Sequence, residues 1–87
     1  MYVVMVYDVN TKRVAKILKI GRIYLNWVQN SVLEGELTKA QFEKLKTKIA
    51  KAIDDQEDSV LFYIMENQKL LSKEKLGVEK NIISNII

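Results

Sequence analysis

The chain has 87 residues, of which 48% are hydrophobic and 29% charged, and it carries a net charge of +3 with neither cysteine nor histidine. This length and composition predict one globular domain, and the two missing residue types exclude disulfides, thiolate metal sites, cysteine nucleophiles and histidine general bases. A net charge of this size permits nucleic-acid binding without requiring it, and a domain this small is expected to gain stability from an oligomer interface.

The first element is a nearly continuous apolar run, Tyr2–Val9, which is rich in β-branched and aromatic residues. Such a run is typical of a strand buried on both faces, so we place it in the middle of a sheet. It is too short to span a membrane and has no basic leader, so we expect a cytoplasmic protein with no signal peptide and no membrane partner.

A helix is expected next, from about Lys12 to Tyr24, with Asn10 or Thr11 as its cap. Residues Asn26–Leu37 then have the composition of strands. Turn candidates at Asn30-Ser31 and at Gly35 leave two alternatives, a tight hairpin or one long bent strand.

The start of the second helix is the best-marked boundary in the sequence. Thr38 and Gln41 have the spacing of a capping box, and Leu37 and Phe42 are placed to form a hydrophobic staple around it. We expect this helix to end near Ile53.

An acidic loop, Asp54–Asp58, and a second apolar strand, Ser59–Met65, complete a β-α-β-β-α-β order. With short, right-handed connections this order predicts an α+β, ferredoxin-like sandwich, in which two helices cover one face of an antiparallel sheet. Residues 1–65 form the predicted core domain.

The remaining residues, 66–87, are predicted to be a C-terminal extension of the same domain. The segment Asn81–Ile87 holds four isoleucines and no charge, so it must pack against something. We expect it to add a strand to the sheet of a partner subunit in a homodimer.

Four motifs in this order resemble the small CRISPR-associated "Cas-two" family. They are Tyr7-Asp8-Val9 at the end of the first strand, Arg13 at the start of the first helix, Trp27-Val-Gln-Asn-Ser-Val-Leu-Glu-Gly35, and Asp58-Ser-Val-Leu-Phe-Tyr63. The resemblance covers residues 2–65. It departs from the family pattern at Trp27, where the family has arginine, and at Leu33, where the family has phenylalanine.

The resemblance implies a ferredoxin-like homodimer that bridges DNA in the complex that captures CRISPR spacers, together with an integrase partner. It also implies a metal-dependent endonuclease acting on single-stranded RNA or duplex DNA. Two alternatives stay open: a toxin-like endoribonuclease of the same fold (the VapD type), and a scaffold that does not cleave.

Asp8 is the expected catalytic and metal-binding residue of this implied nuclease. Mg²⁺ is usually held by one or two carboxylates together with water and phosphate oxygens, so two copies of Asp8 across a dimer axis could hold Mg²⁺ or Mn²⁺. The alternative is that Asp8 only caps the following turn.

Lys12, Arg13 and Lys16 are the expected phosphate contacts, because cations along a helix bind a nucleic-acid backbone independently of sequence. The alternative is a solvated helix face, which is also our interpretation of the second-helix lysines at 44, 48 and 51. Tyr7 and Ser31 are supporting candidates near Asp8, although Tyr7 also suits the edge of the core and Ser31 a hairpin turn.

Overall fold

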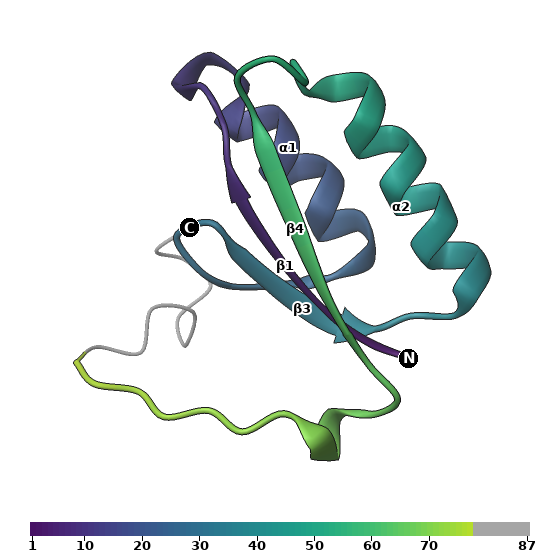
Figure 1. Cartoon of the computed structure of the whole chain (residues 1–87). Helices are drawn as coiled ribbons and strands as arrows, with labels where there is room; N and C mark the ends of the chain where they lie inside the picture. The colour runs from purple at the N-terminus through teal and green to yellow at the C-terminus, as the bar shows by residue number, and fades with distance from the viewer. Residues whose placement is uncertain (78–87) are drawn as a thin grey trace.

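The four expected strands form one antiparallel sheet, in a computed structural model that describes residues 1–77. Strands β1 (Tyr2–Asp8), β2 (Asn26–Gln29), β3 (Val32–Glu36) and β4 (Ser59–Met65) lie in the order β2-β3-β1-β4. Helices α1 (Thr11–Tyr24) and α2 (Lys39–Ala52) pack side by side on one face of the sheet and leave the other face without a helix (Figure 1). The predicted α+β, ferredoxin-like fold is confirmed.

The core lies between this sheet and the two helices. Val3, Met5 and Tyr7 of β1 point toward the helices and are buried there. Alternate residues of a strand point to opposite faces, so Val4, Val6 and Asp8 lie on the face opposite the helices, which we call the open face. β1 is an inner strand, as expected, but on the open face the described residues bury only Tyr2 and leave Val4 and Val6 half-buried.

Both helix starts follow from local sequence. The Asn10 side chain accepts a hydrogen bond from the Lys12 N–H and caps α1. Thr38 and Gln41 form the expected capping box at α2, each side chain accepting a hydrogen bond from the other residue's backbone N–H.

The segment after α1 is a hairpin rather than one bent strand. Asn30 lies in its turn with a φ of 42°, which asparagine tolerates better than most residues. Gly35 makes no turn, because it pairs with Val3 in the middle of β3.

Residues 66–77 leave the lower end of β4, form a short 3-10 helix at Gln68–Leu70 and run back toward β2 (Figure 1). Two lysines hold this segment: Lys73 Nζ lies 2.6 Å from Glu34 Oε2, and Lys75 Nζ donates a 2.7 Å hydrogen bond to Gln29 Oε1. The expected exchanged strand at Asn81–Ile87 lies outside the described residues.

No helix within residues 1–77 combines the length and the apolar character needed to cross a membrane.

Candidate nucleic-acid and metal site

Asp8 ends the inner strand β1, and its exposed carboxylate lies on the open face. The register with β4 places Ser59 directly opposite Asp8. On the other side of β1, the Tyr7 N–H donates a 3.0 Å hydrogen bond to the Ser31 carbonyl, so Ser31 lies at the same edge of the sheet as Asp8. One carboxylate and two serines therefore lie near this edge.

Tyr7 belongs to the opposite face. Its ring is buried in the core with a 3% exposed fraction, and this burial raises the pKa of its hydroxyl, while hydrogen bonding with Ser31 partly offsets the rise. The structure therefore does not bring the Tyr7 hydroxyl to the face on which Asp8 lies.

Arg13 is held by acidic residues at the start of β4. Its Nε donates to Asp58 Oδ2 at 2.5 Å, and its Nη2 donates to Asp58 Oδ1 at 3.0 Å and to Glu57 Oε1 at 2.6 Å. The Arg13 side chain is 16% exposed and that of Asp58 is 0% exposed. Much of the guanidinium is thus already occupied, which leaves it less free for phosphate than an exposed lysine.

Asp58 is the residue to which the sequence analysis assigned no role, since it treated Asp54–Asp58 only as an acidic loop between two elements. Besides Arg13, it accepts hydrogen bonds from the backbone N–H groups of Asn10 and Asp54. Hydrogen bonding from Arg13 lowers the pKa of the Asp58 carboxyl well below its usual range, and the same pairing raises the pKa of Arg13. A signal was present, because Arg13 and Asp58 both belong to the four motifs quoted above.

Lys12 and Lys16 are exposed on α1. They lie on the helical layer, on the other side of the sheet from the open face that carries Asp8. The structure therefore keeps the expected phosphate contacts and the expected metal ligand on two different faces of one subunit.

In the described part of the chain, Asp8 does not belong to a cluster of carboxylates that could surround a metal ion. Within residues 1–77 no three acidic side chains come together in a group suited to a metal ion, and the chain has no histidine or cysteine to add. The exposed Asp8 carboxylate does fit Mg²⁺ or Mn²⁺ as one hard oxygen ligand, provided that a second subunit or a phosphate supplies others.

The open face beside Asp8 is apolar. The β-register groups its side chains on one surface: Val4 lies opposite Tyr63, and Val6 lies between Val32 and Leu61. Leu61 and Tyr63 are 50% and 55% exposed. An exposed apolar surface of this kind marks an interaction site in a soluble protein.

A buried carboxylate borders this surface. Glu34 accepts a 2.6 Å hydrogen bond from the Tyr2 hydroxyl and pairs with Lys73. Burial, followed by the hydrogen bond to Glu34, raises the pKa of Tyr2 above its usual range. Because all partners of Glu34 are internal to the chain, we assign it a structural role in holding residues 66–77.

Comparison with known proteins gives one consistent result. Residues 1–73 match the family described as CRISPR associated protein Cas2. The chain is 66% identical to the CRISPR-associated endoribonuclease Cas2 of Thermotoga maritima over 80 residues, which is 92% of each protein. It is 54% identical to the protein of the same name from Methanocaldococcus jannaschii, over all of this chain and 76% of that one.

Solved structures agree with the sequence relatives. A structure described as a crystal structure of cas2 superposes with a TM-score of 0.87 at 41% identity and covers 95% of this chain and 93% of that one. The Cas2 of Streptococcus pyogenes, crystallised at pH 6.5, superposes with a TM-score of 0.80 at 36% identity over 88% of this chain and 100% of that one.

Proposed function

Because the chain belongs to the CRISPR-associated Cas2 family, a family of nucleases, we propose that it is a homodimer that bridges DNA in CRISPR spacer acquisition and has a metal-dependent endonuclease centre at paired Asp8. The relatives are named endoribonucleases. We therefore propose single-stranded RNA as one substrate and duplex DNA as the other.

The observation that carries this proposal is the position of Asp8. Its exposed carboxylate ends an inner strand and lies on the same face as the apolar side chains of Val4, Val6, Leu61 and Tyr63. Two copies that pack their open faces together about a two-fold axis near this edge bring two Asp8 carboxylates together. The apolar surface supplies a reason for the copies to associate.

The paired carboxylates would hold Mg²⁺ or Mn²⁺ with water and a substrate phosphate as the other ligands. Bound there, a divalent cation supplies charge stabilisation for a phosphate and a more acidic water. Asp8 would bind the cation and orient the phosphate, and Ser59, which lies directly opposite Asp8 in the β-register, can hydrogen-bond a phosphate oxygen or a water. Ser31 is less suited to this role, because its side chain hydrogen-bonds with Tyr7 on the other face. The chain has no histidine, so the proposed mechanism assigns no proton transfer to a histidine side chain.

Lys12 and Lys16 are the proposed phosphate contacts of the bridging role. Both are exposed on α1, and they bind backbone charge without reading sequence. Arg13 takes a smaller share, since Asp58 and Glu57 already occupy its guanidinium. In this role the chain acts with an integrase subunit, in the manner implied by the family.

The test compares the wild type with Asp8→Ala on single-stranded RNA and on duplex DNA, with Mg²⁺, with Mn²⁺ and with chelator. We expect wild-type cleavage that requires the cation and that falls at least about 100-fold in the variant, because a metal ligand contributes more than the outer-shell residues whose loss costs 10- to 100-fold.

Asp55→Ala is the matched control, because it removes another exposed carboxylate, in the α2–β4 loop, that the proposed metal site does not use, and it should keep wild-type activity. Cleavage that survives in Asp8→Ala would contradict the nuclease assignment. Binding to the integrase and to DNA without any cleavage would leave the bridging role as the function of this chain.

A further inference from the structure

The main-chain link that follows Asp8 is fixed by one side chain. The pairing of β1 with β4 ends at Asp8 itself, opposite Ser59, and α1 begins at Thr11. Between them, the Asn10 N–H donates a 2.9 Å hydrogen bond to Asp58 Oδ1. Asp58 immediately precedes Ser59 in the chain, so this bond continues the attachment of β1 to β4 beyond the end of the strand pairing.

The Asp58 carboxylate is itself held in one orientation. Oδ2 accepts hydrogen bonds from Arg13 Nε and, at 2.8 Å, from the Asp54 N–H, while Oδ1 accepts one from Arg13 Nη2. Arg13 therefore binds both carboxylate oxygens in the planar, bidentate geometry that fixes a carboxylate. Because the Asp58 side chain is 0% exposed, water does not compete for these bonds. Asp8 is thus placed by the strand that precedes it and by Asp58 beyond it.

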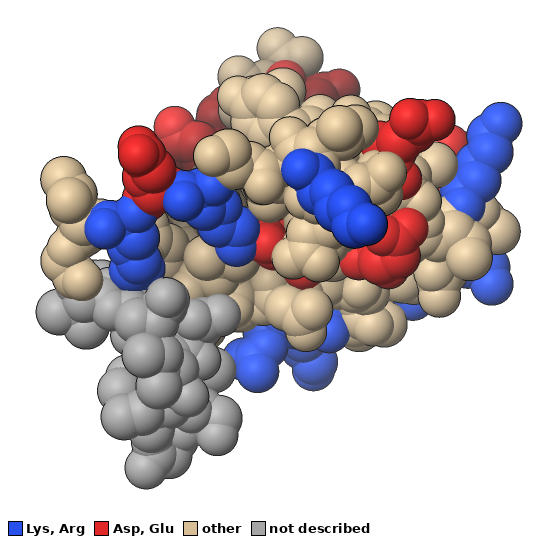
Figure 2. Space-filling model, turned by 90° about the horizontal axis from the view of Figure 1, so that it is seen from below, with Lys and Arg blue, Asp and Glu red and all other residues tan. Residues whose placement is uncertain are grey.

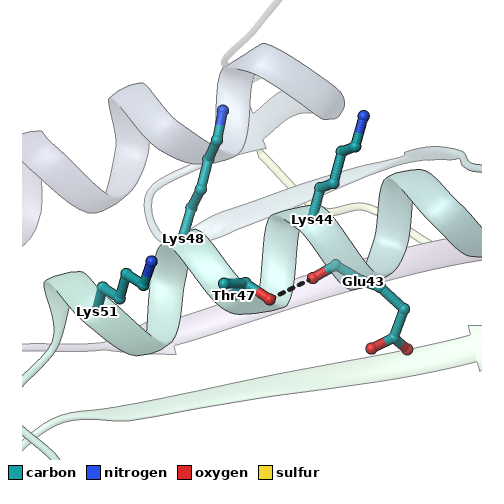
Figure 3. A pocket seen from close by; sticks show the side chains of 5 residues that line it. All are labelled: Glu43, Lys44, Thr47, Lys48 and Lys51. Atoms are coloured by element: carbon teal, nitrogen blue, oxygen red, sulfur yellow. Dashed lines mark hydrogen bonds between the residues drawn. The ribbon is translucent and has the colours of Figure 1, made fainter.

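Arg13 differs from the other cations of the helical layer. Three exposed lysines extend from α2 beside a shallow hollow, and none of them pairs with a carboxylate within residues 1–77 (Figure 3). They are Lys44, Lys48 and Lys51. Seen from below, basic and acidic side chains are interspersed on the surface (Figure 2), and even the paired Lys46 and Glu43 have side chains 41% and 59% exposed. Exposed pairs of this kind contribute little, whereas Arg13 is largely enclosed together with Asp58.

We propose that Asp58, held by Arg13, is a positioning residue of the nuclease centre, which keeps the Asp8 carboxylate where two copies can share one cation. The inference rests on the proposed function, since it presupposes paired Asp8 carboxylates. In this role Asp58 touches neither cation nor substrate, because its own hydrogen-bond partners enclose it. The main role of Arg13 is then to orient Asp58.

A shared cation makes the centre sensitive to small displacements of Asp8. Mg²⁺ requires nearly ideal octahedral geometry, with ligand oxygens at about 2.0–2.1 Å. In the proposed dimer one substitution displaces both carboxylates, because each copy contributes one. Loss of a residue that orients metal ligands lowers metal affinity by about 10- to 100-fold. We therefore expect Asp58→Asn to weaken binding of the cation and to leave binding of the nucleic acid unchanged.

The experiment measures Mn²⁺ binding to the full chain at pH 7 from the EPR signal of the free ion, with Asp8→Ala as the background. We expect Asp58→Asn to weaken the Asp8-dependent binding at least about tenfold. In cleavage of single-stranded RNA, the Mn²⁺ concentration that gives half the maximal rate should rise by the same factor, while the KM for RNA stays at the wild-type value. Loss of folded protein would instead lower the rate equally at every Mn²⁺ concentration.

Two further variants separate positioning from charge and from stability. Arg13→Lys keeps the charge but loses the bidentate geometry, so we expect it to weaken Mn²⁺ binding as well. Thr38→Ala removes the cap of α2, which lies near Met1 at the end of β1 opposite to Asp8. This variant should be less stable than the wild type and keep its Mn²⁺ affinity.

The possible failures of this inference and of the proposed function are distinguishable. Wild-type Mn²⁺ affinity in Asp58→Asn or in Arg13→Lys would overturn the inference and leave the Asp8 centre in place. Equal losses in Asp58→Asn and Thr38→Ala would also overturn it, because a general loss of stability would explain both. Mn²⁺ binding that Asp8→Ala leaves unchanged would contradict the proposed centre, and the inference with it.

Discussion

At the scale of single residues, the interaction with the most hydrogen bonds to one side chain is the cluster of Arg13 and Asp58. The Asp58 carboxylate, at the end of the α2–β4 loop, joins the start of this loop to the start of α1, because its hydrogen-bond donors come from Asp54, Asn10 and Arg13. The sequence analysis could identify both members as motif residues but could not pair them, since 45 residues separate them. Their pairing depends on β1 and β4 being neighbours.

Asp58→Asn tests what this cluster contributes to stability. A carboxyl whose pKa is lowered by folding stabilises the native state above its unfolded pKa, which is about 3.9 for aspartate, and this stabilisation is lost as the pH falls toward the folded value. We expect the variant to be less stable than the wild type in urea unfolding at pH 6–7. The difference should shrink progressively below about pH 4.

Asp55→Asn, in the same loop but exposed, should follow the wild type at every pH. A difference between Asp58→Asn and wild type that stayed constant down to pH 2 would show that the carboxylate charge is not what stabilises the cluster.

At the scale of elements, the sequence predicted most of what is observed, because the signals are local. The capping box at Thr38 marks the start of α2 without any tertiary information. The hairpin was less certain, because Asn30 and Gly35 were both suitable for a turn. Gly35 instead lies within β3, where an added Cβ would make an ordinary van der Waals contact at 3.4 Å with Leu25 Cδ2, and sequence alone does not separate a glycine within a strand from a glycine in a turn.

Thr38→Ala measures the contribution of the capping box. Removing the side-chain acceptor leaves the Gln41 N–H without its partner, and we expect a loss of about 1 kcal/mol in the free energy of unfolding. Thr47→Ala in the same helix is the control, because its hydroxyl only bonds back to the Glu43 carbonyl. That variant should be neutral or gain up to about 0.5 kcal/mol from the helix propensity of alanine. Equal losses in both variants would contradict a capping role.

At the scale of the whole molecule, a single subunit explains the apolar composition of Tyr2–Val9 only in part. The composition of Tyr2–Val9 predicts a strand covered on both faces, yet the described residues cover one face and leave Val4 and Val6 half-buried. The proposed metal site has a related requirement, because paired Asp8 carboxylates need a second copy of the chain. Both features point to the open face as the proposed dimer interface.

Leu61→Glu tests this interface. The residue is 50% exposed on the open face, so the change should leave the fold intact and introduce two buried charges into a face-to-face dimer. We expect the mass by light scattering to fall from that of a dimer to that of a monomer at micromolar concentration, because an unpaired buried charge costs several kcal/mol. Ile23→Glu, at a position 62% exposed on α1, should remain dimeric. A dimeric Leu61→Glu would place the interface elsewhere.

The position of the exposed Lys12 and Lys16 on the helical layer has a consequence for the valency of the proposed dimer. Packing two open faces together would turn both helical layers outward, so the proposed dimer would present two basic surfaces that point in opposite directions. One such dimer would then be able to cross-link two duplexes, or two remote stretches of one duplex. Once the first surface is occupied, the second samples its target at the high effective concentration set by the intervening DNA. A chain of this size can in this way tether large molecules without any moving part.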